Sequence, residues 1–474
     1  MLGSNNFFNT FFFKYLSLGF VLGYFIFVVL KNEVPIDDSD GLQHFFTAQY
    51  SWSNSSFFLN HWGKPLFILF SSPFAQFGFK AYLFFNLLVF LLSVLIAFSL
   101  FRKFKASPLT YFLFPISCLL IPDYVEGVCG GMTEPFFGFL LLLILWLGVH
   151  QKWILFAIVV SFLPFARSEG MLVVLMAGVF LLVIKEFKAI PLLIIGFTLY
   201  SFAGKLLLND WMWYFNNDPY PKNSPYGNGN WYHYLQAFKR HLGIINLLLL
   251  PFISYYLFRL FKKGERKLFL LFLFFIGIYL IVIAVHSYLW ANGLKGAMGL
   301  SRLATLGVLP VLFFAVLSFN LVISQKNTVT LIIAVILCAL SVNQVVHYDF
   351  PTKETEFHSE LKKGIQYTKN HYSKKTYYFH PMIAYYEGIN TFDTKIKTIQ
   401  SFGLLSDEGV HYLRKGDCII RDSQFGPIEQ GMPFDRIEQF SWLKKVKTFT
   451  LKTPFTEYHG ETRCVIIYEV MAQN

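Results

Sequence analysis

Repeated apolar segments of about 17–25 residues are the feature that most constrains what this chain can fold into. A helix of that length crosses the hydrocarbon core of a bilayer, and such runs recur between residues 11 and 346. Only 14% of the 474 residues are charged, whereas a typical soluble domain has about 25%. The sequence therefore predicts a polytopic α-helical membrane protein.

The apolar runs predict about eleven transmembrane helices. No small-residue cleavage pattern follows the first run, so this run is expected to remain as a span. The predicted spans are 11–30, 81–101, 109–122, 134–149, 153–166, 170–184, 189–208, 242–261, 268–287, 303–323 and 328–346.

The basic residues of the short loops predict the orientation of these spans. Clusters at 102–105 and 259–267 lie in alternate loops, as do single residues such as Lys152. Cytoplasmic loops carry an excess of Lys and Arg, so these loops mark the cytoplasmic side. An odd number of spans then places the C-terminus on the outer face.

The acidic residues of the membrane region favour the opposite face. Residues 1–346 hold 23 Lys and Arg against 12 Asp and Glu, and only Glu186 and Glu265 lie in cytoplasmic loops. The positive excess therefore belongs to the membrane region, and no nucleic-acid partner is expected. Because acids contribute little to topology, we expect a working surface on the outer face. The outward acids are Glu33, Asp37, Asp38, Asp40, Asp123, Glu126, Glu134, Glu169, Asp210 and Asp218.

The sequence predicts two domains, a membrane region over 1–346 and an outer domain over 347–474. Balanced charge, a candidate helix at 356–369 and short apolar strands predict a small α/β fold for the second domain. Whether its Cys418 and Cys464 form a disulfide is left open by the sequence. The long outer loops of the membrane region are 31–80, 123–134, 209–241 and 287–302.

An Asp-Asp-Ser-Asp motif directly follows the first span and is the leading candidate for catalysis. It contains Asp37, Asp38 and Asp40. A carboxylate there can act as general base on an acceptor hydroxyl. Asp37 and Asp38 can instead bind a divalent cation through their oxygens. The plainer alternative is a solvated flank at the end of a membrane helix.

The segment HWGKPLF contains His61 and Lys64 and opens an apolar stretch too short to span a bilayer. That stretch suits an interfacial or re-entrant helix. Lys64 is predicted either to contact the phosphate of a lipid-linked substrate or to extend to the headgroup level as many membrane lysines do.

Three more segments place charge near the outer face. Thr133-Glu134-Pro135 is typical of a helix start, so Glu134 either complements the helix dipole or takes part in catalysis. Arg167 and Glu169 separate two short apolar segments, and charges at such depth pair or line a cavity. Arg302 opens a late span on the outer side, where its planar guanidinium suits a phosphate.

Several known signatures are absent from the sequence. It has no P-loop, no HExxH, no GxSxG and no Cys/His metal spacing, so coupling to bound ATP is not expected. Charges midway along the spans are few, which weakens the alternative of an ion-driven transporter or lipid flippase. A non-catalytic scaffold, the third alternative, leaves the outer acids and cations without a purpose.

The order of these motifs over residues 1–325 resembles that of integral-membrane glycosyltransferases of the GT-C fold. The types that it resembles include protein O-mannosyltransferases, lipid A aminoarabinose transferases and dolichol-phosphate-mannose-dependent mannosyltransferases. The resemblance implies transfer of a sugar from a polyprenyl-phosphate-linked donor to a glycan, lipid or protein acceptor. It also implies a multi-pass protein of the bacterial plasma membrane, with the active site facing the periplasm or exterior.

The resemblance also implies roles for single residues. Asp37 or Asp38 supplies the base or binds a cation, with Asp40 in support. Lys64, next to His61, meets the carrier phosphate. The other residues that it assigns to substrate binding are Glu134, Arg167, Glu169 and Arg302.

Overall fold

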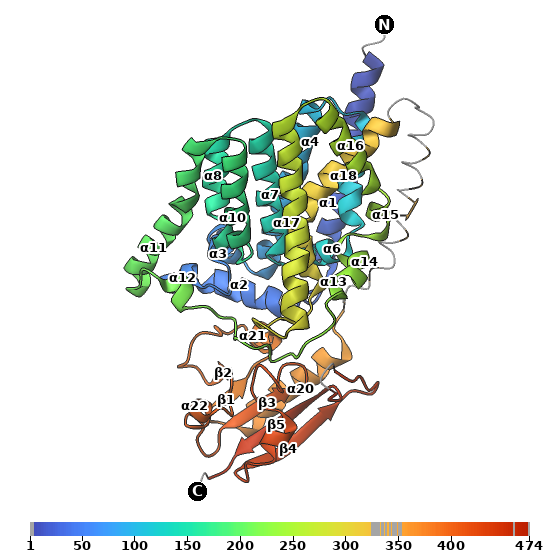
Figure 1. Ribbon diagram of the computed structural model, residues 1–474. Coiled ribbons are helices and arrows are strands. Elements are labelled where there is room, and N and C mark those ends of the chain that lie inside the picture. The colour runs from blue at the N-terminus through green and yellow to red at the C-terminus, as the bar shows by residue number, and fades with distance from the viewer. Residues whose placement is uncertain are drawn as a thin grey trace. The chain divides into compact units, whose positions relative to one another are not determined.

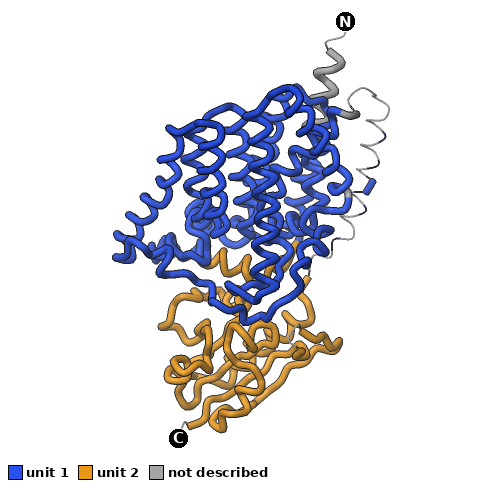
Figure 2. Tube along the Cα trace, viewed as in Figure 1, with its two compact units in different colours: residues 1–31, 47–350 blue, residues 32–46, 351–474 orange. Residues whose placement is uncertain are grey.

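The computed structural model describes residues 4–323, 353–457 and 460–472, together with a few isolated positions between 324 and 352. The contacts within the chain divide it into two compact units (Figure 2). The helical unit contains residues 1–31 and 47–350, and the sheet unit contains residues 32–46 and 351–474.

The acidic segment after the first helix belongs to the sheet unit. The sequence predicts residues 32–46 as part of an outer loop of the membrane region, whereas the structure groups them with 351–474. The boundary between the units falls within α2 (Asp40–Tyr50).

The helical unit consists of long helices joined by short ones (Figure 1). Its described elements are α1 (Ser4–Lys31), η1 (Ser55–Leu59), α3 (Pro65–Ala75), α4 (Phe79–Lys103), α5 (Pro108–Leu119), α6 (Pro122–Gly130), α7 (Glu134–Val149), α8 (Trp153–Ser161), α9 (Leu163–Ala166), α10 (Gly170–Val183), η2 (Phe187–Ile194), α11 (Ile195–Leu208), α12 (Trp213–Asn216), α13 (His233–Gln236), α14 (Phe238–His241), α15 (Ile244–Leu247), α16 (Pro251–Lys262), α17 (Arg266–Ala291), η3 (Ser301–Gly307) and α18 (Val308–Ile323).

The predicted count of eleven spans is not confirmed. Among the described residues, four helical stretches are long and apolar enough to cross a membrane, or five if the bent pair α5–α6 counts as one. That pair bends by 76° where Pro122 begins the second helix. Most other predicted spans are apolar helices of 10–17 residues, and the last, 328–346, lies outside the described residues. The four stretches are Phe79–Lys103, Phe187–Leu208, Arg266–Ala291 and Ser301–Leu321.

Two of these stretches differ sharply in burial. The apolar window within Ser301–Leu321 is 94% buried, whereas that within Phe187–Leu208 is 11% buried. The first therefore lies in the centre of the helical unit, and the second presents its apolar face outward. Aromatic side chains fill the centre, as where Phe314 stacks on Phe272 with ring centroids 3.8 Å apart.

The sheet unit contains a mixed sheet of five strands in the order β2-β1-β3-β5-β4. β1 pairs in parallel with β2 and β3, while β5 runs antiparallel to β3 and β4. The predicted helix and three predicted strands are all present, so the small α/β fold is confirmed. The described elements are α20 (Glu356–His371), β1 (Thr376–Tyr378), α21 (Pro381–Glu387), β2 (Thr398–Gln400), α22 (Asp407–Val410), β3 (Cys418–Asp422), α23 (Phe434–Ile437), β4 (Leu443–Thr450) and β5 (Cys464–Val470).

Cys418 and Cys464 do not pair. Both are buried free thiols. In the antiparallel pair, Cys418 lies opposite Glu469 on β5, whereas Cys464 begins β5 and lies opposite Thr450 on β4. The two cysteines therefore sit at opposite ends of the β3–β5 ladder.

Candidate active site

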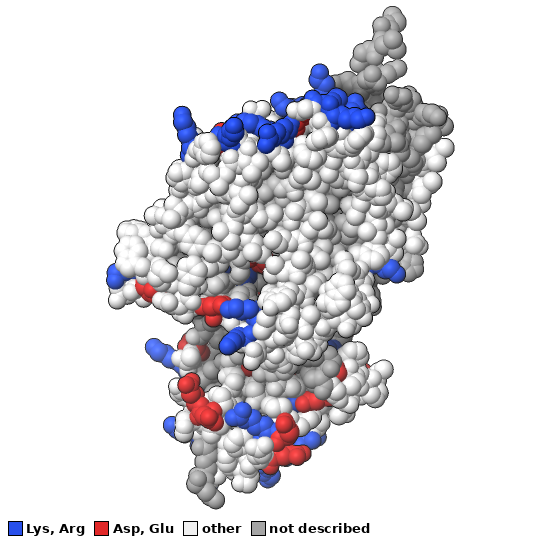
Figure 3. All heavy atoms as spheres, in the orientation of Figure 1, with Lys and Arg blue, Asp and Glu red and all other residues white. Residues whose placement is uncertain are grey.

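Lys and Arg side chains gather at one end of the helical unit (Figure 3). The last turns of α4 and α16 contribute basic residues to this unit, namely the exposed Arg102, Lys103 and Lys262 and the half-buried Arg259. A set of buried and partly buried charged residues around Arg167 forms a separate cluster, which is the candidate site.

Arg167 is the centre of this cluster. It lies in the turn between α9 and α10 and is 7% exposed. Its Nη1 donates to Thr133 Oγ1 at 2.7 Å and lies 3.0 Å from Glu134 Oε1. Its Nη2 and Nε donate to the two carboxylate oxygens of Glu169 at 3.1 and 3.3 Å. Each nitrogen of the guanidinium therefore contacts a neighbouring side chain.

The contact with Arg167 also concerns the helix start that the sequence predicts at Thr133. α7 begins at Glu134 as predicted, but the Thr133 side chain makes no capping hydrogen bond. Its hydroxyl instead accepts from Arg167, so Thr133 occupies the expected cap position without the side-chain hydrogen bond of a cap.

Glu169 joins Arg167 to a histidine on α17. His286 Nε2 lies 3.1 Å from Glu169 Oε1. Burial raises the pKa of Glu169, but Arg167 and the hydrogen bond with His286 outweigh it and hold the pKa well below its ordinary value. Glu169 is therefore ionised and pairs with the Arg167 cation.

Glu134 has one oxygen engaged and one without a partner. Its Oε1 lies 3.0 Å from Arg167 and 3.5 Å from Arg302 Nε, while Oε2 has no hydrogen-bond partner among the described residues. The side chain is 3% exposed. A buried acceptor without a donor costs about 1–3 kcal/mol, which a ligand hydroxyl would recover.

Lys64 is a buried cation without a carboxylate partner among the described residues. It is 4% exposed, its Nζ donates to Tyr220 Oη, and it lies 4.9 Å from the centroid of that ring. Its φ of +67° is uncommon for a residue other than glycine, and it immediately precedes Pro65. Such strain is typical of sites where a side chain must take a fixed direction.

His61 lies three residues before Lys64 and stacks on Tyr214, with ring centroids 4.2 Å apart. Ser168, next to Arg167, lies 3.4 Å from His61 Nε2. Burial, together with the nearby Lys64 charge, lowers the pKa of His61 from 6.5 to about 4. His61 is therefore neutral at physiological pH.

Two ion pairs anchor the aromatic outer loop 209–241 to its surroundings. Lys295 Nζ lies 2.7 Å from Asp218 Oδ2, and Asn223 forms an isolated β-bridge with Leu294. At the far end of the loop, Arg240 pairs with Asp123 at 2.8 Å. The loop that carries Tyr214 and Tyr220 to His61 and Lys64 is thus held both within its length and at its C-terminal end.

The acidic motif lies in the sheet unit. Asp37 Oδ1 accepts hydrogen bonds from Ser39 N at 3.2 Å, from Ser39 Oγ at 3.1 Å and from Gly41 N at 2.8 Å. It therefore satisfies backbone N–H groups at the start of α2, which Asp40 begins.

Asp38 makes a different contact. Its Oδ2 lies 3.1 Å from His358 Nε2 on α20. Burial raises its pKa, but the His358 hydrogen bond and the fields of His380 and Arg463 outweigh burial, so the pKa is lowered. Asp38 is therefore ionised at neutral pH.

The structure brings together most of the predicted substrate-binding residues. Arg167, Glu134, Glu169 and Arg302 form one network in the helical unit, and Ser168 links it to His61. Asp37, Asp38 and Asp40 belong to the sheet unit. No group of three or more His, Cys, Asp or Glu side chains with metal-site geometry occurs within the described ranges.

Sequence reasoning missed His286, Tyr220 and His358. His286 is an ionisable residue within the predicted span 268–287, which is a signal of function that was available in the sequence. Tyr220 lies in an outer loop that is rich in aromatics, where composition gives no reason to select it. His358 lies 320 residues from Asp38, and local sequence cannot indicate that contact.

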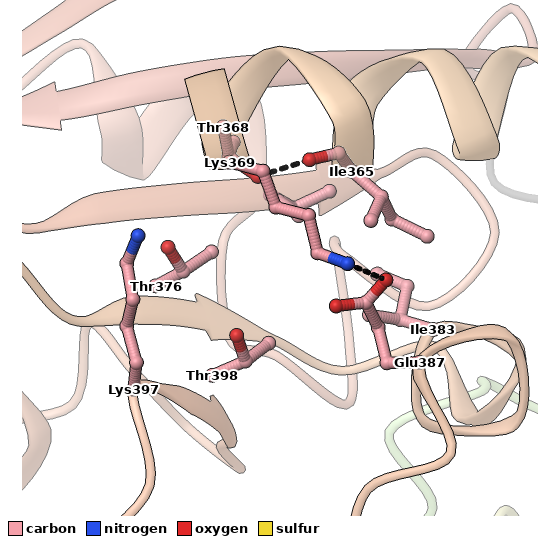
Figure 4. A pocket seen from close by; sticks show the side chains of 9 residues that line it. Ile365, Thr368, Lys369, Thr376, Ile383, Glu387, Lys397 and Thr398 are labelled. Carbon is pink, nitrogen blue, oxygen red and sulfur yellow. Dashed lines mark hydrogen bonds and ion pairs between the residues drawn. The ribbon is translucent and has the colours of Figure 1, made fainter. Parts of the chain in front are cut away.

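The sheet unit also contains a small pocket beside β1 and β2. Figure 4 shows Lys369 pointing to Glu387, with which it forms a 2.9 Å ion pair. Lys397 donates to the carbonyl of Tyr372. Since both lysines that line the pocket are already engaged, it offers a ligand mainly the hydroxyls and apolar side chains of its wall.

No protein-family model matches this sequence, and no curated protein matches it either. Two crystal structures of ArnT from Cupriavidus metallidurans are similar to the whole chain. The structure bound to undecaprenyl phosphate has a TM-score of 0.56 at 9% identity, with 95% of this chain and 97% of ArnT covered. The apo structure has a TM-score of 0.55 at 9% identity, with coverage of 97% and 98%. As the order of the motifs predicted, this membrane protein has the GT-C fold.

Proposed function

We propose that this protein is a glycosyltransferase that moves a sugar from a polyprenyl-phosphate-linked donor to an acceptor. The observation that carries the proposal is Lys64, a buried cation without a carboxylate partner among the described residues. An uncompensated buried charge is costly, so such a lysine calls for an anionic ligand. A lipid phosphate meets that need, and ArnT, which shares the fold, has been crystallised with undecaprenyl phosphate.

The cations of the cluster suit a phosphate ligand. Arg167 is held between Glu134 and Glu169, whereas Lys64 has no carboxylate partner among the described residues. His61 is neutral, because its pKa is lowered. Lys64 is therefore the expected contact of the anion, with Arg302 as a second cation beside Glu134.

The remaining residues receive roles from their contacts. Arg167 directs each of its three nitrogens to a neighbouring side chain, so it positions Glu134 and Glu169. Glu134 Oε2, buried and without a donor among the described residues, accepts a hydroxyl of the sugar. The carboxylates of the acidic motif serve the acceptor, as general base or through a divalent cation.

The membrane location of the proposed reaction follows from the chemistry of the donor. A polyprenyl phosphate stays in the bilayer, so its enzyme works at headgroup depth. The acceptor is a glycan, lipid or protein on the extracytoplasmic side of a bacterial plasma membrane. The basic end of the helical unit then faces the cytoplasm. The proposed domains are the membrane region 1–346 and the outer domain 347–474.

A transfer assay tests this function. Full-length protein in proteoliposomes receives undecaprenyl phosphate carrying a labelled pentose or hexose, together with a bacterial membrane extract as acceptor. We expect release of undecaprenyl phosphate and label in a new product. Lys64→Ala should lower the rate at least about tenfold. Lys80→Ala, which removes an exposed lysine that donates to the Leu30 carbonyl, is the matched control.

The same assay separates the second candidate, a flippase for the lipid-linked sugar. The bent pair α5–α6 favours it, because broken helices are typical of transporters. A flippase would move the labelled lipid across the bilayer and leave its sugar–phosphate bond intact. That result, or release of undecaprenyl phosphate no faster than without protein, would contradict the glycosyltransferase proposal.

A further inference from the structure

His358 holds one oxygen of Asp38 and leaves the other open. Asp38 Oδ2 receives the His358 contact, and no described residue donates to Oδ1. The Asp38 side chain is 26% exposed, so Oδ1 has access to a ligand. Asp37 differs, because its Oδ1 already accepts three hydrogen bonds at the start of α2.

The proton on His358 can be located from its contacts. His358 Nδ1 accepts the backbone N–H of Thr355 at 3.3 Å, within a capping box at the start of α20. Because Nδ1 accepts, the contact between Nε2 and Asp38 Oδ2 has the Nε2–H group as its donor. Both ring nitrogens are engaged and the side chain is 3% exposed, so His358 has no open position from which to accept a proton itself.

A second histidine lies in the same environment. His380 is fully buried, its Nδ1 accepts the backbone N–H of Met382, and its Nε2 has no hydrogen-bond partner among the described residues. It acts electrostatically on Asp38, as does Arg463. The C-terminal part of the chain thus surrounds Asp38 with donors and positive charge.

We propose that His358 is a positioning residue that orients Asp38 so that Oδ1 meets the acceptor or its cation. Asp37 then mainly supports the start of α2. This inference rests on the proposed glycosyl transfer and places a residue from the C-terminal part of the chain beside the proposed base. Both residues belong to the sheet unit.

The test compares full-length variants in the transfer assay and in hydrogen–deuterium exchange of residues 32–46. His358→Ala should lower kcat about tenfold or more with little change in the KM for undecaprenyl-phosphate-linked sugar, because it misplaces a reacting group. His358→Gln keeps an N–H donor and should restore most of kcat. Asp38→Asn should lower kcat more than Asp37→Asn, since an Asn at 37 still accepts the capping N–H groups. His371→Ala, on the exposed side of α20, is the matched control.

The exchange measurement keeps this inference separate from the proposed function. His358→Ala should speed exchange in 32–46, and His358→Gln should restore the slow rate. If wild-type protein transfers no sugar, the proposed function fails, and exchange alone decides whether His358 holds Asp38. Unchanged exchange and unchanged kcat in His358→Ala would overturn the inference, as would an equal loss in Asp37→Asn and Asp38→Asn.

Discussion

The buried cluster around Arg167 and the acidic motif around Asp38 are both charged, yet they are held in different ways. Arg167 directs each of its three nitrogens to side chains that are buried or nearly so. Asp38 relies on one histidine and keeps an oxygen open to solvent. Substitution of Arg167 should therefore mainly lower the free energy of unfolding, and substitution of Asp38 should mainly lower the transfer rate.

The largest expected effect comes from breaking the buried cluster. Arg167→Ala leaves Glu134 and Glu169 buried without their main partner, which costs about 3–5 kcal/mol. Thermal unfolding of the detergent-solubilised protein measures the loss. Lys267→Ala removes a pair with Glu186 whose side chains are half and one-third exposed, and should cost only about 0–1 kcal/mol. Equal losses of stability in Arg167→Ala and Lys267→Ala would contradict the expected difference between buried and exposed ion pairs.

The next effect concerns pH and His61. Its pKa is about 4 in the folded protein and 6.5 when unfolded, so between these values the unfolded chain binds the extra proton. Stability should therefore be complete above pH 6.5 and fall by about 3 kcal/mol as pH drops to 4. His61→Asn removes this titration. Melting curves of the two proteins should converge as pH falls, and parallel curves would contradict the prediction.

A smaller effect tests the packing of the outer loops. A Cβ at Gly229 would lie 2.0 Å from Nε1 of Trp290, so Gly229→Ala should cost about 1–3 kcal/mol through overpacking. Faster proteolysis of the loop 209–241 is the expected sign. Gly23→Ala is the control, because a Cβ there meets nothing within 4 Å. If the loop of Gly229→Ala is cut no faster than in the control, this packing account is wrong.

The smallest stability effect is expected at Asp37. Asp37→Ala removes the acceptor for the N–H groups of Ser39 and Gly41 and should cost about 0.5–2 kcal/mol. Asp37→Asn should retain most of this stability, because its amide oxygen can accept the same bonds. The comparison of the two melting temperatures checks the capping role, which equal losses would exclude.

Local sequence signals predicted much of the fold. The bounds of α7 match the prediction at both ends, because a polar Thr133-Glu134-Pro135 start and a polar His150-Gln151-Lys152 end flank the apolar run. The number of membrane spans could not be predicted as well, because the length of an apolar run does not show where a helix bends, as at Pro122. β4 was missed because its three lysines resemble a surface segment; it lies at the edge of the sheet.

The candidate site was predictable where its residues carry charge in an apolar context. Lys64, Glu134, Arg167 and Arg302 could be selected on that ground. The contact of Asp38 with His358 could not, because it depends on how the chain folds back over 320 residues. Nor does the sequence show that Lys64 lacks a carboxylate partner among the described residues, which depends on the surrounding packing.

The most direct test of the central claim is a structure of the full-length protein determined with undecaprenyl phosphate. We expect phosphate density within hydrogen-bond distance of Lys64 Nζ, the group that donates to Tyr220 Oη in this structure. Phosphate bound elsewhere, with the Lys64–Tyr220 contact intact, would contradict the claim that this buried lysine holds the lipid carrier.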